Sequence, residues 1–264
     1  MKRRDFAGLP LFGIAACMLP AAAAPPAIDI NDAINMAGRQ RMLSQRAAKS
    51  YMAMGQKILG DRADKVLASS MALFDRQLAE LIAFAPTPEI KTTFASLQSL
   101  WSDYKLALVG NAAVKADAEA VLGLAGKVLQ TANQATVQLE TFSGRATSKL
   151  VNISGRQRML SQRMAAYYLS AGWGVQASAS ATELIKARDE FVKAHELLTN
   201  APQTTPTIKA ELQLAQTQFT FFDLALQNLK PGAGDAPAQT NVFTTSERIL
   251  QVMDGVTGMY AKLG

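Results

Sequence analysis

Two arginines, each three residues after a glycine, are the strongest candidates for chemistry in this chain: Arg41 after Gly38 and Arg158 after Gly155. Residues three apart lie on one face of a helix, so each glycine leaves room near its arginine for another backbone. A guanidinium is a planar fork of N–H donors, and two forks can hold one planar oxyanion from opposite sides. The pattern predicts an anion-binding site made of these four residues.

The four residues belong to a block of twelve that occurs twice, at an offset of 117. Residues 35–46 (NMAGRQRMLSQR) and 152–163 (NISGRQRMLSQR) are identical at ten positions. A duplicated fold needs only matching apolar spacing, so the retained polar residues indicate a polar task. Gln45 and Gln162 lie on the stripes of the two arginines and are secondary ligand-binding candidates. They either orient the guanidinium groups or fill a polar interface, and we favour the interface.

The segments that carry the block contain bases without acids. No Asp or Glu occurs in residues 33–60 or 141–182, although each segment holds five Lys or Arg residues. An exposed helix usually places acids four residues from its bases. These helices must therefore find anions on other helices, in solvent or in a ligand. Two facing guanidinium groups about 4 Å apart would repel by roughly 4 kcal/mol at an effective dielectric of about 20, and a small anion between them would turn this into attraction.

The remaining arginines of the block are expected to be structural. They are Arg39, Arg46, Arg156 and Arg163. We expect them to form ion pairs with acids on other helices, such as Asp75, Glu80, Asp103 or Glu190.

The composition predicts an all-α fold. Ala, Leu, Gln and Met are abundant, long windows lack proline, and alternating strand patterns are few. The repeat predicts two tandem four-helix bundles related by an internal pseudo-two-fold axis, in residues 27–142 and 143–264. Residues 143–147 between them are either a hinge or the middle of one long helix.

Turn signals divide each half into four expected helices. In the first half they cover about 31–59, 61–84, 88–109 and 114–142, with Asp61 capping the second. In the second half they cover about 147–171 and 180–199, a third that begins at Thr205-Pro206, and 241–262 after a linker at 230–237. Thr87 and Thr205, each before a proline, are expected N-caps. The expected core aromatics are Phe74, Phe191, Trp101, Tyr104, Phe219 and Phe222.

The first 24 residues have the pattern of an export signal. Lys2-Arg3-Arg4 precedes a short apolar stretch and the small residues Ala21–Ala24, and Arg3-Arg4-Asp5-Phe6 resembles a twin-arginine motif. Cys17, the only cysteine, lies in a sequence that resembles a lipoprotein-processing box. It is either a lipid anchor or, as we favour, part of the discarded signal. We expect a periplasmic protein without a transmembrane segment in its mature chain.

The repeated block resembles two groups of bacterial sensor modules. Its pattern Asn-x-Ala/Ser-Gly-x-x-Arg-Met-x-Ser-x-Arg is similar to the P-box of nitrate/nitrite sensor kinases. The fuller string Gly-Arg-Gln-Arg-Met-Leu-Ser-Gln-Arg resembles the N-terminal domain of type IV pilus methyl-accepting chemotaxis transducers. In the nitrate sensors the ligand lies between two copies of the first helix, held by the arginine three residues after the P-box glycine. This resemblance implies the same role for Arg41 and Arg158, although Arg39-Gln40 and Arg156-Gln157 depart from the small or apolar residues of the nitrate sensors.

The favoured function is an exported sensor-like module that binds a small inorganic or carboxylate anion, nitrate or nitrite first. It would signal through a separate membrane receptor or sensor kinase. The alternative is a structural or interaction protein that docks to a receptor or pilus-chemotaxis component without a small ligand. Removal of the signal lowers the formal charge from +6 to about +4, which is too small to indicate nucleic acid.

An enzyme is the weakest interpretation. The sole histidine, His195, has no nucleophile or metal-ligand cluster near it in the sequence, and Ser44 and Ser161 have no base at helical spacing. No Cys/His grouping indicates zinc, and no glycine-rich loop indicates a nucleotide. We therefore expect no catalytic residue, no metal and no cofactor.

Overall fold

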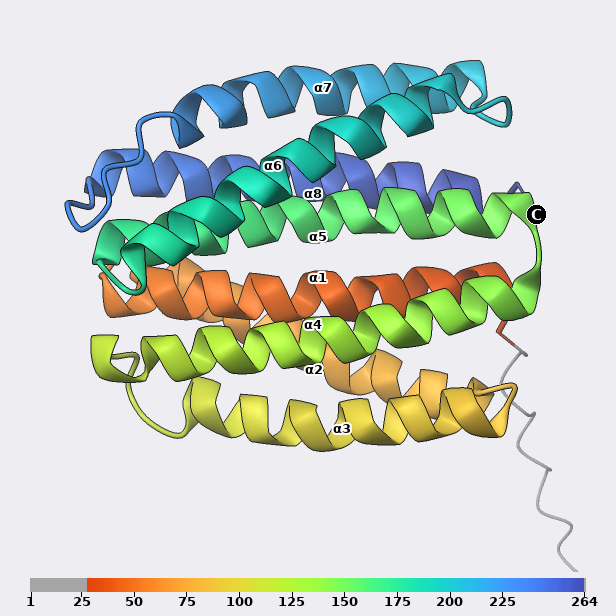
Figure 1. Cartoon of the computed structure of the whole chain (residues 1–264), viewed down its shortest axis with the longest axis horizontal. Coiled ribbons are helices and arrows are strands. Elements are labelled where there is room, and N and C mark those ends of the chain that lie inside the picture. The colour runs from red at the N-terminus through yellow and green to blue at the C-terminus, as the bar shows by residue number, and fades with distance from the viewer. Residues whose placement is uncertain (1–27, 264) are drawn as a thin grey trace, which may run out of the picture.

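The computed structural model describes residues 28–263, which form eight α-helices and no strand (Figure 1). One bundle contains α1 (Ile30–Gly55), α2 (Gly60–Phe84), α3 (Pro88–Val109) and α4 (Lys115–Ser143). The other contains α5 (Ala146–Trp173), α6 (Ala177–Asn200), α7 (Pro206–Leu226) and α8 (Ala236–Ala261). The predicted all-α class with two tandem bundles is confirmed. The expected signal peptide, the twin-arginine motif and Cys17 lie outside the described residues.

Helices α1 and α5 lie side by side at the centre of the molecule, where the two bundles meet (Figure 1). They run parallel and in register. Ser148 on α5 donates to Oδ1 of Asn31 on α1 at 2.6 Å, and Gln56 donates to the carbonyl of Leu169 at 3.1 Å. Each central helix also packs against the second and fourth helices of its own bundle. This arrangement buries the central helices on almost every face, polar residues included.

The two Thr-Pro helix starts form as predicted. The hydroxyl oxygen of Thr87 accepts from the amide of Ile90, and that of Thr205 accepts from the amide of Ile208, both at 3.3 Å. Proline follows each cap, at a position where its missing N–H leaves no helical bond unmade.

Three expected boundaries are wrong. Helix α1 ends at Gly55 rather than near 59, because the chain turns through left-handed residues before α2. Leu59, with φ of 50°, takes the N-cap position of α2 without a side-chain bond, so Asp61 is not the cap. Helix α8 begins at Ala236 rather than 241, since Pro237 fits its first turn.

The segment between the bundles is a tight reversal. Gly144 ends α4 with φ of 64°, and α5 begins two residues later and runs back along it (Figure 1). A positive φ favours glycine because it has no Cβ. The interpretation of residues 143–147 as the middle of one long helix is therefore wrong.

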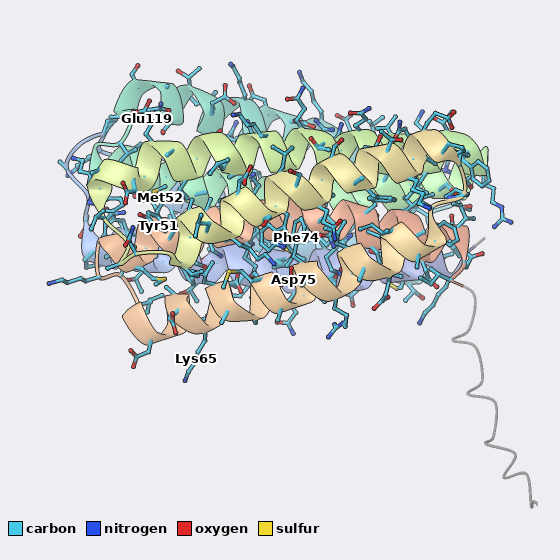
Figure 2. All side chains as sticks on the ribbon, turned by 90° about the horizontal axis from the view of Figure 1, so that it is seen from below. Tyr51, Met52, Lys65, Phe74, Asp75 and Glu119 are labelled. Atoms are coloured by element: carbon cyan, nitrogen blue, oxygen red, sulfur yellow. The ribbon has the colours of Figure 1, made fainter. Side chains whose placement is uncertain are left out.

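Aromatic side chains fill equivalent places in both cores, as predicted. Phe74 stacks on Trp101 with ring centroids 3.8 Å apart, and Phe191 stacks on Phe219 at 4.3 Å. Tyr104 and Phe222 are fully buried. Charged residues such as Lys65 instead point away from the helices (Figure 2).

Candidate functional site

The predicted arginines meet between α1 and α5. A methyl group placed on Gly38 would lie 3.1 Å from Nη2 of Arg41 and 3.6 Å from Nη2 of Arg158. A methyl placed on Gly155 would lie 3.0 Å from Nη2 of Arg158 and 3.6 Å from Nη2 of Arg41. Both arginines are completely buried. The two guanidinium groups therefore lie against the two glycines and close to each other, and their role toward a ligand remains a prediction.

Each arginine reaches across to the opposite central helix. Nη2 of Arg41 donates to the backbone carbonyl of Asn152 at 3.1 Å, and Nη2 of Arg158 donates to that of Asn35 at 3.2 Å. The repeated asparagines thus take part in the site, although they were not among the predicted ligand-binding residues. Their position at the start of each repeated block was the available signal.

The fourth helix of each bundle supplies a further partner, and here the two halves differ. Nη1 of Arg41 donates to Oδ1 of Asn133 on α4 at 2.8 Å. Nη1 of Arg158 donates to a carboxylate oxygen of Asp254 on α8, which also accepts from Arg39 at 2.9 Å. Within the described chain Arg41 forms no ion pair, whereas Arg158 forms one.

Burial and nearby positive charges lower the pKa of both guanidinium groups. Burial, followed by the charges of Arg156 and Arg158, lowers the pKa of Arg41 to about 9. Burial lowers the pKa of Arg158 to about 10, and Asp254 opposes this. Both groups stay charged at neutral pH, so the site confines two like charges in a medium of low dielectric.

Several polar atoms at the site find no hydrogen-bond partner among residues 28–263. They are Nε of Arg41, Nε of Arg158 and Oδ1 of both Asn35 and Asn152, all buried. A guanidinium carries five N–H donors, and each of these two makes two hydrogen bonds within the described part of the chain. Buried polar atoms are nearly always hydrogen-bonded. We therefore expect the free N–H donors and amide oxygens to bind a further partner.

The two glutamines fill a polar interface, and none of their hydrogen bonds within residues 28–263 involves the two guanidinium groups. Gln45 donates to Oγ of Ser44 and to the carbonyl of Ala125 on α4, at 3.2 and 3.1 Å. Gln162 makes the same contacts with Ser161 and with the carbonyl of Ser246 on α8. Each glutamine therefore ties its central helix to the fourth helix of its bundle.

The other arginines of the block form ion pairs, as predicted, mostly with unexpected acids. Only the pair of Arg156 with Glu190 involves an expected partner. The remaining pairs are Arg39 with Asp254, Arg46 with Glu247 and Arg163 with Glu183. Asp75, one of the expected acids, instead accepts from Trp101 and Lys105.

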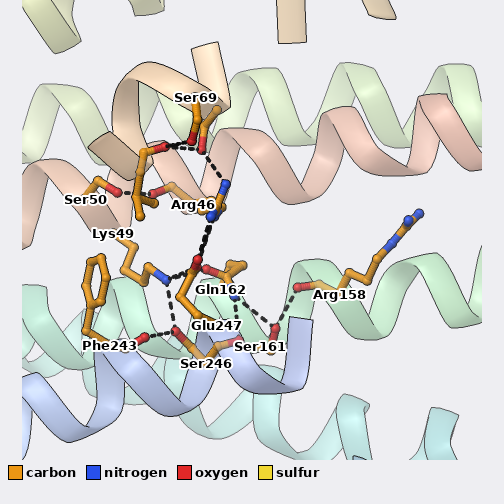
Figure 3. A network of polar contacts seen from close by, with 12 residues as sticks. Arg46, Lys49, Ser50, Ser69, Arg158, Ser161, Gln162, Phe243, Ser246 and Glu247 are labelled. Atoms are coloured by element: carbon orange, nitrogen blue, oxygen red, sulfur yellow. Dashed lines mark hydrogen bonds and ion pairs between the residues drawn. The ribbon is translucent and has the colours of Figure 1, made fainter. Parts of the chain in front are cut away.

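A buried lysine joins the two bundles through a network of polar contacts (Figure 3). Lys49 on α1 has no exposed surface and donates to Gln162, Ser246 and Glu247 at 2.6, 3.0 and 2.6 Å. Burial favours the neutral acid, but Lys49 and Arg46 outweigh it and hold the pKa of Glu247 at about 2. The Arg158 side chain points away from this network (Figure 3).

Residues 28–263 contain no cluster of three or more His, Cys, Asp or Glu side chains that could hold a metal. His195 is mostly buried and stacks on Phe191, with ring centroids 6.1 Å apart. Burial lowers its pKa.

A protein-family profile identifies the family of this chain. The profile of the type IV pili methyl-accepting chemotaxis transducer N-terminal domain matches residues 30–138 and again residues 140–252. The chain belongs to this family. Each bundle of the structure corresponds to one copy of this sensor-like domain of chemotaxis transducers. This supports the pilus-transducer part of the resemblance and not the nitrate/nitrite sensor part.

No curated protein and no solved structure gives a significant match to the chain. Within the described residues, none of the eight helices is long and apolar enough to cross a membrane. The two tandem domains pack together through α1 and α5.

Proposed function

We propose that this chain is an exported sensor-like module that binds a small oxyanion between α1 and α5. Gly38 and Gly155 make the space, and Arg41 and Arg158 hold the ligand. The proposed units are residues 27–142 and 143–264, one supplying each arginine. The module acts in the periplasm and passes its bound state to a separate membrane receptor or sensor kinase of a chemotaxis pathway.

The observation that carries this proposal is the state of Arg41. It is fully buried beside a second guanidinium, and its direct partners are two neutral oxygens, those of Asn133 and Asn152. A buried charge without a countercharge is strongly unfavourable, and a like charge nearby adds to the cost. A small anion bound by the unused N–H groups of both arginines would remove this cost.

A structural role is the competing explanation. Arg41 and Arg158 each bond a carbonyl of the opposite central helix, so they also tie the two bundles together. In that case their replacement lowers the melting temperature and changes no ligand binding.

Calorimetric titration separates the two explanations. The wild-type chain is titrated with nitrate, nitrite, sulfate and small carboxylates such as acetate, beside the variants Arg41→Lys and Arg158→Lys. Lysine keeps the charge but lacks the planar fork, so each variant should lose at least tenfold in affinity. Arg188→Lys is the control, because Arg188 pairs with Asp223 on the far side of the second bundle. If folded Arg41→Lys and Arg158→Lys bind these anions with the wild-type affinity, the assignment of the site to these arginines is wrong.

A further inference from the structure

We propose that Asn133 and Asp254 make the arginine pair selective for a singly charged anion. This inference rests on the proposed function and specifies its ligand class. The two residues perform the same task in the two bundles, yet one is neutral and the other carries a negative charge.

The equivalence of the two positions follows from helix register. Helix α4 begins at Lys115 and α8 at Ala236, 121 residues later, and the same offset relates Asn133 to Asp254. The glutamine contacts agree, because Gln45 bonds the carbonyl of Ala125 and Gln162 bonds that of Ser246. Both residues also accept from Nη1 of their arginine.

The charge of the site follows from these partners. Two buried guanidinium groups face one directly bonded carboxylate, that of Asp254, which leaves one positive charge. Arg39 shares that carboxylate but is partly exposed to solvent, and Arg156 is paired with Glu190. Glu140, which accepts from Asn152, acts on Arg41 only through space, and the Arg156–Glu190 pair adds one charge of each sign there.

One monoanion neutralises this remaining charge. A dianion would leave a surplus negative charge in a buried place, which is unfavourable without a further partner. With an asparagine at both positions the pair would carry two charges and favour a dianion. With an aspartate at both positions the arginines would already be neutralised.

The surface around the two residues indicates the direction of approach. Asn133 lines a groove of about 420 Å³ together with three bases and two acids, Arg156, Arg163, Lys186, Glu183 and Glu190. Asp254 lines a groove of about 450 Å³ together with four arginines and Glu247. Both acids of the first groove pair with other arginines, and within residues 28–263 no carboxylate bonds Arg41. We therefore expect an anion to reach Nη1 of Arg41 from the first groove, through rotation of the neutral Asn133.

The test is a titration at neutral pH and constant ionic strength with two pairs of probes, nitrate against sulfate and acetate against malonate. The wild-type chain should bind the monoanion of each pair more tightly. Asp254→Asn should shift the ratio of affinities at least tenfold toward the dianion. Asn133→Asp should lose at least tenfold in affinity for all four probes.

Asp223→Asn is the matched control. It removes the carboxylate of the Arg188–Asp223 ion pair, which is remote from the site, and should leave all affinities unchanged. Melting curves identify the variants that fold. If the wild-type chain binds no probe, both the selectivity and the proposed function are wrong. If it binds nitrate while folded Asp254→Asn keeps the same ratios, or folded Asn133→Asp keeps its affinity, only the selectivity is wrong.

Discussion

The two sides of the central helix pair are joined in different ways. On the α1–α8 side, Arg39 pairs with Asp254 and Arg46 pairs with Glu247, so ion pairs connect the two bundles. The buried Lys49 strengthens this side through the same glutamate, at 2.6 Å.

On the α4–α5 side, the equivalent arginines pair within their own bundle. Arg156 and Arg163 bond Glu190 and Glu183, both on α6. Across this side Arg156 donates to Asn133 at 3.3 Å, a hydrogen bond to a neutral oxygen. The two repeats therefore hold the same arginines but place the partner acids on different helices. As a result, ion pairs join the two bundles on the α1–α8 side, whereas weaker contacts join them on the α4–α5 side.

Glu247→Gln should lower the free energy of unfolding the most, because it removes the carboxylate that pairs with Arg46 and Lys49 on the α1–α8 side. Lys49 would remain buried without its countercharge, and loss of one partner from a buried pair costs about 3–5 kcal/mol. The matched change on the other side is Glu183→Gln, whose pair with Arg163 is partly exposed and worth about 1 kcal/mol or less. Denaturant unfolding measures both, and equal losses would contradict the comparison.

Acid should weaken the α1–α8 side in a defined range. The folded-state pKa of Glu247, about 2, lies below its ordinary 4.5, so its stabilisation is complete above pH 4.5 and is lost as the pH falls toward 2. The loss is on the order of 3 kcal/mol, since one pKa unit corresponds to about 1.4 kcal/mol. Stability measured against pH should therefore fall less steeply in Glu247→Gln than in the wild type, and parallel curves would show that this carboxylate does not drive the change.

Gly55 on α1 and Gly172 on α5 occupy equivalent positions in the two repeats, but their surroundings differ. A methyl on Gly55 of α1 would lie 2.1 Å from the rigid ring of Trp173, so Gly55→Ala should cost about 1–3 kcal/mol by overpacking. A methyl on Gly172 of α5 would lie 3.0 Å from the flexible amide of Gln239, so Gly172→Ala should cost less. Melting temperatures test the order, and a larger drop for Gly172→Ala would reverse it.

Most of the architecture was predictable from local signals. Helical composition, the glycine and Thr-Pro boundaries and the repeated block together indicate two bundles that meet through their first helices. The meeting of Arg41 and Arg158 also follows from the block, since a glycine stripe on a central helix permits close approach of another helix. Loop geometry was less predictable, because left-handed residues such as Lys57 and Leu59 carry no sequence signal of that conformation.

The partners of the arginines were not predictable. The repeat offset rises from 117 in the first helices to 118 in the third and, after the linker at 230–237, to 121 in the fourth, and this hides the equivalence of Asn133 and Asp254. Lys49 resembles an exposed lysine in the sequence, and its burial depends on Glu247, almost two hundred residues away. Such partners depend on tertiary packing rather than on local pattern.

The tight turn at Gly144 keeps the two bundles together at low protein concentration. A receptor assembled from two separate subunits loses its shared interface on dilution, because association depends on concentration. Here a single peptide link holds both arginine-bearing helices at a fixed, high effective concentration. The contact between Arg41-bearing α1 and Arg158-bearing α5 therefore persists in one isolated molecule, and each half is free to diverge without the constraint of identical subunits.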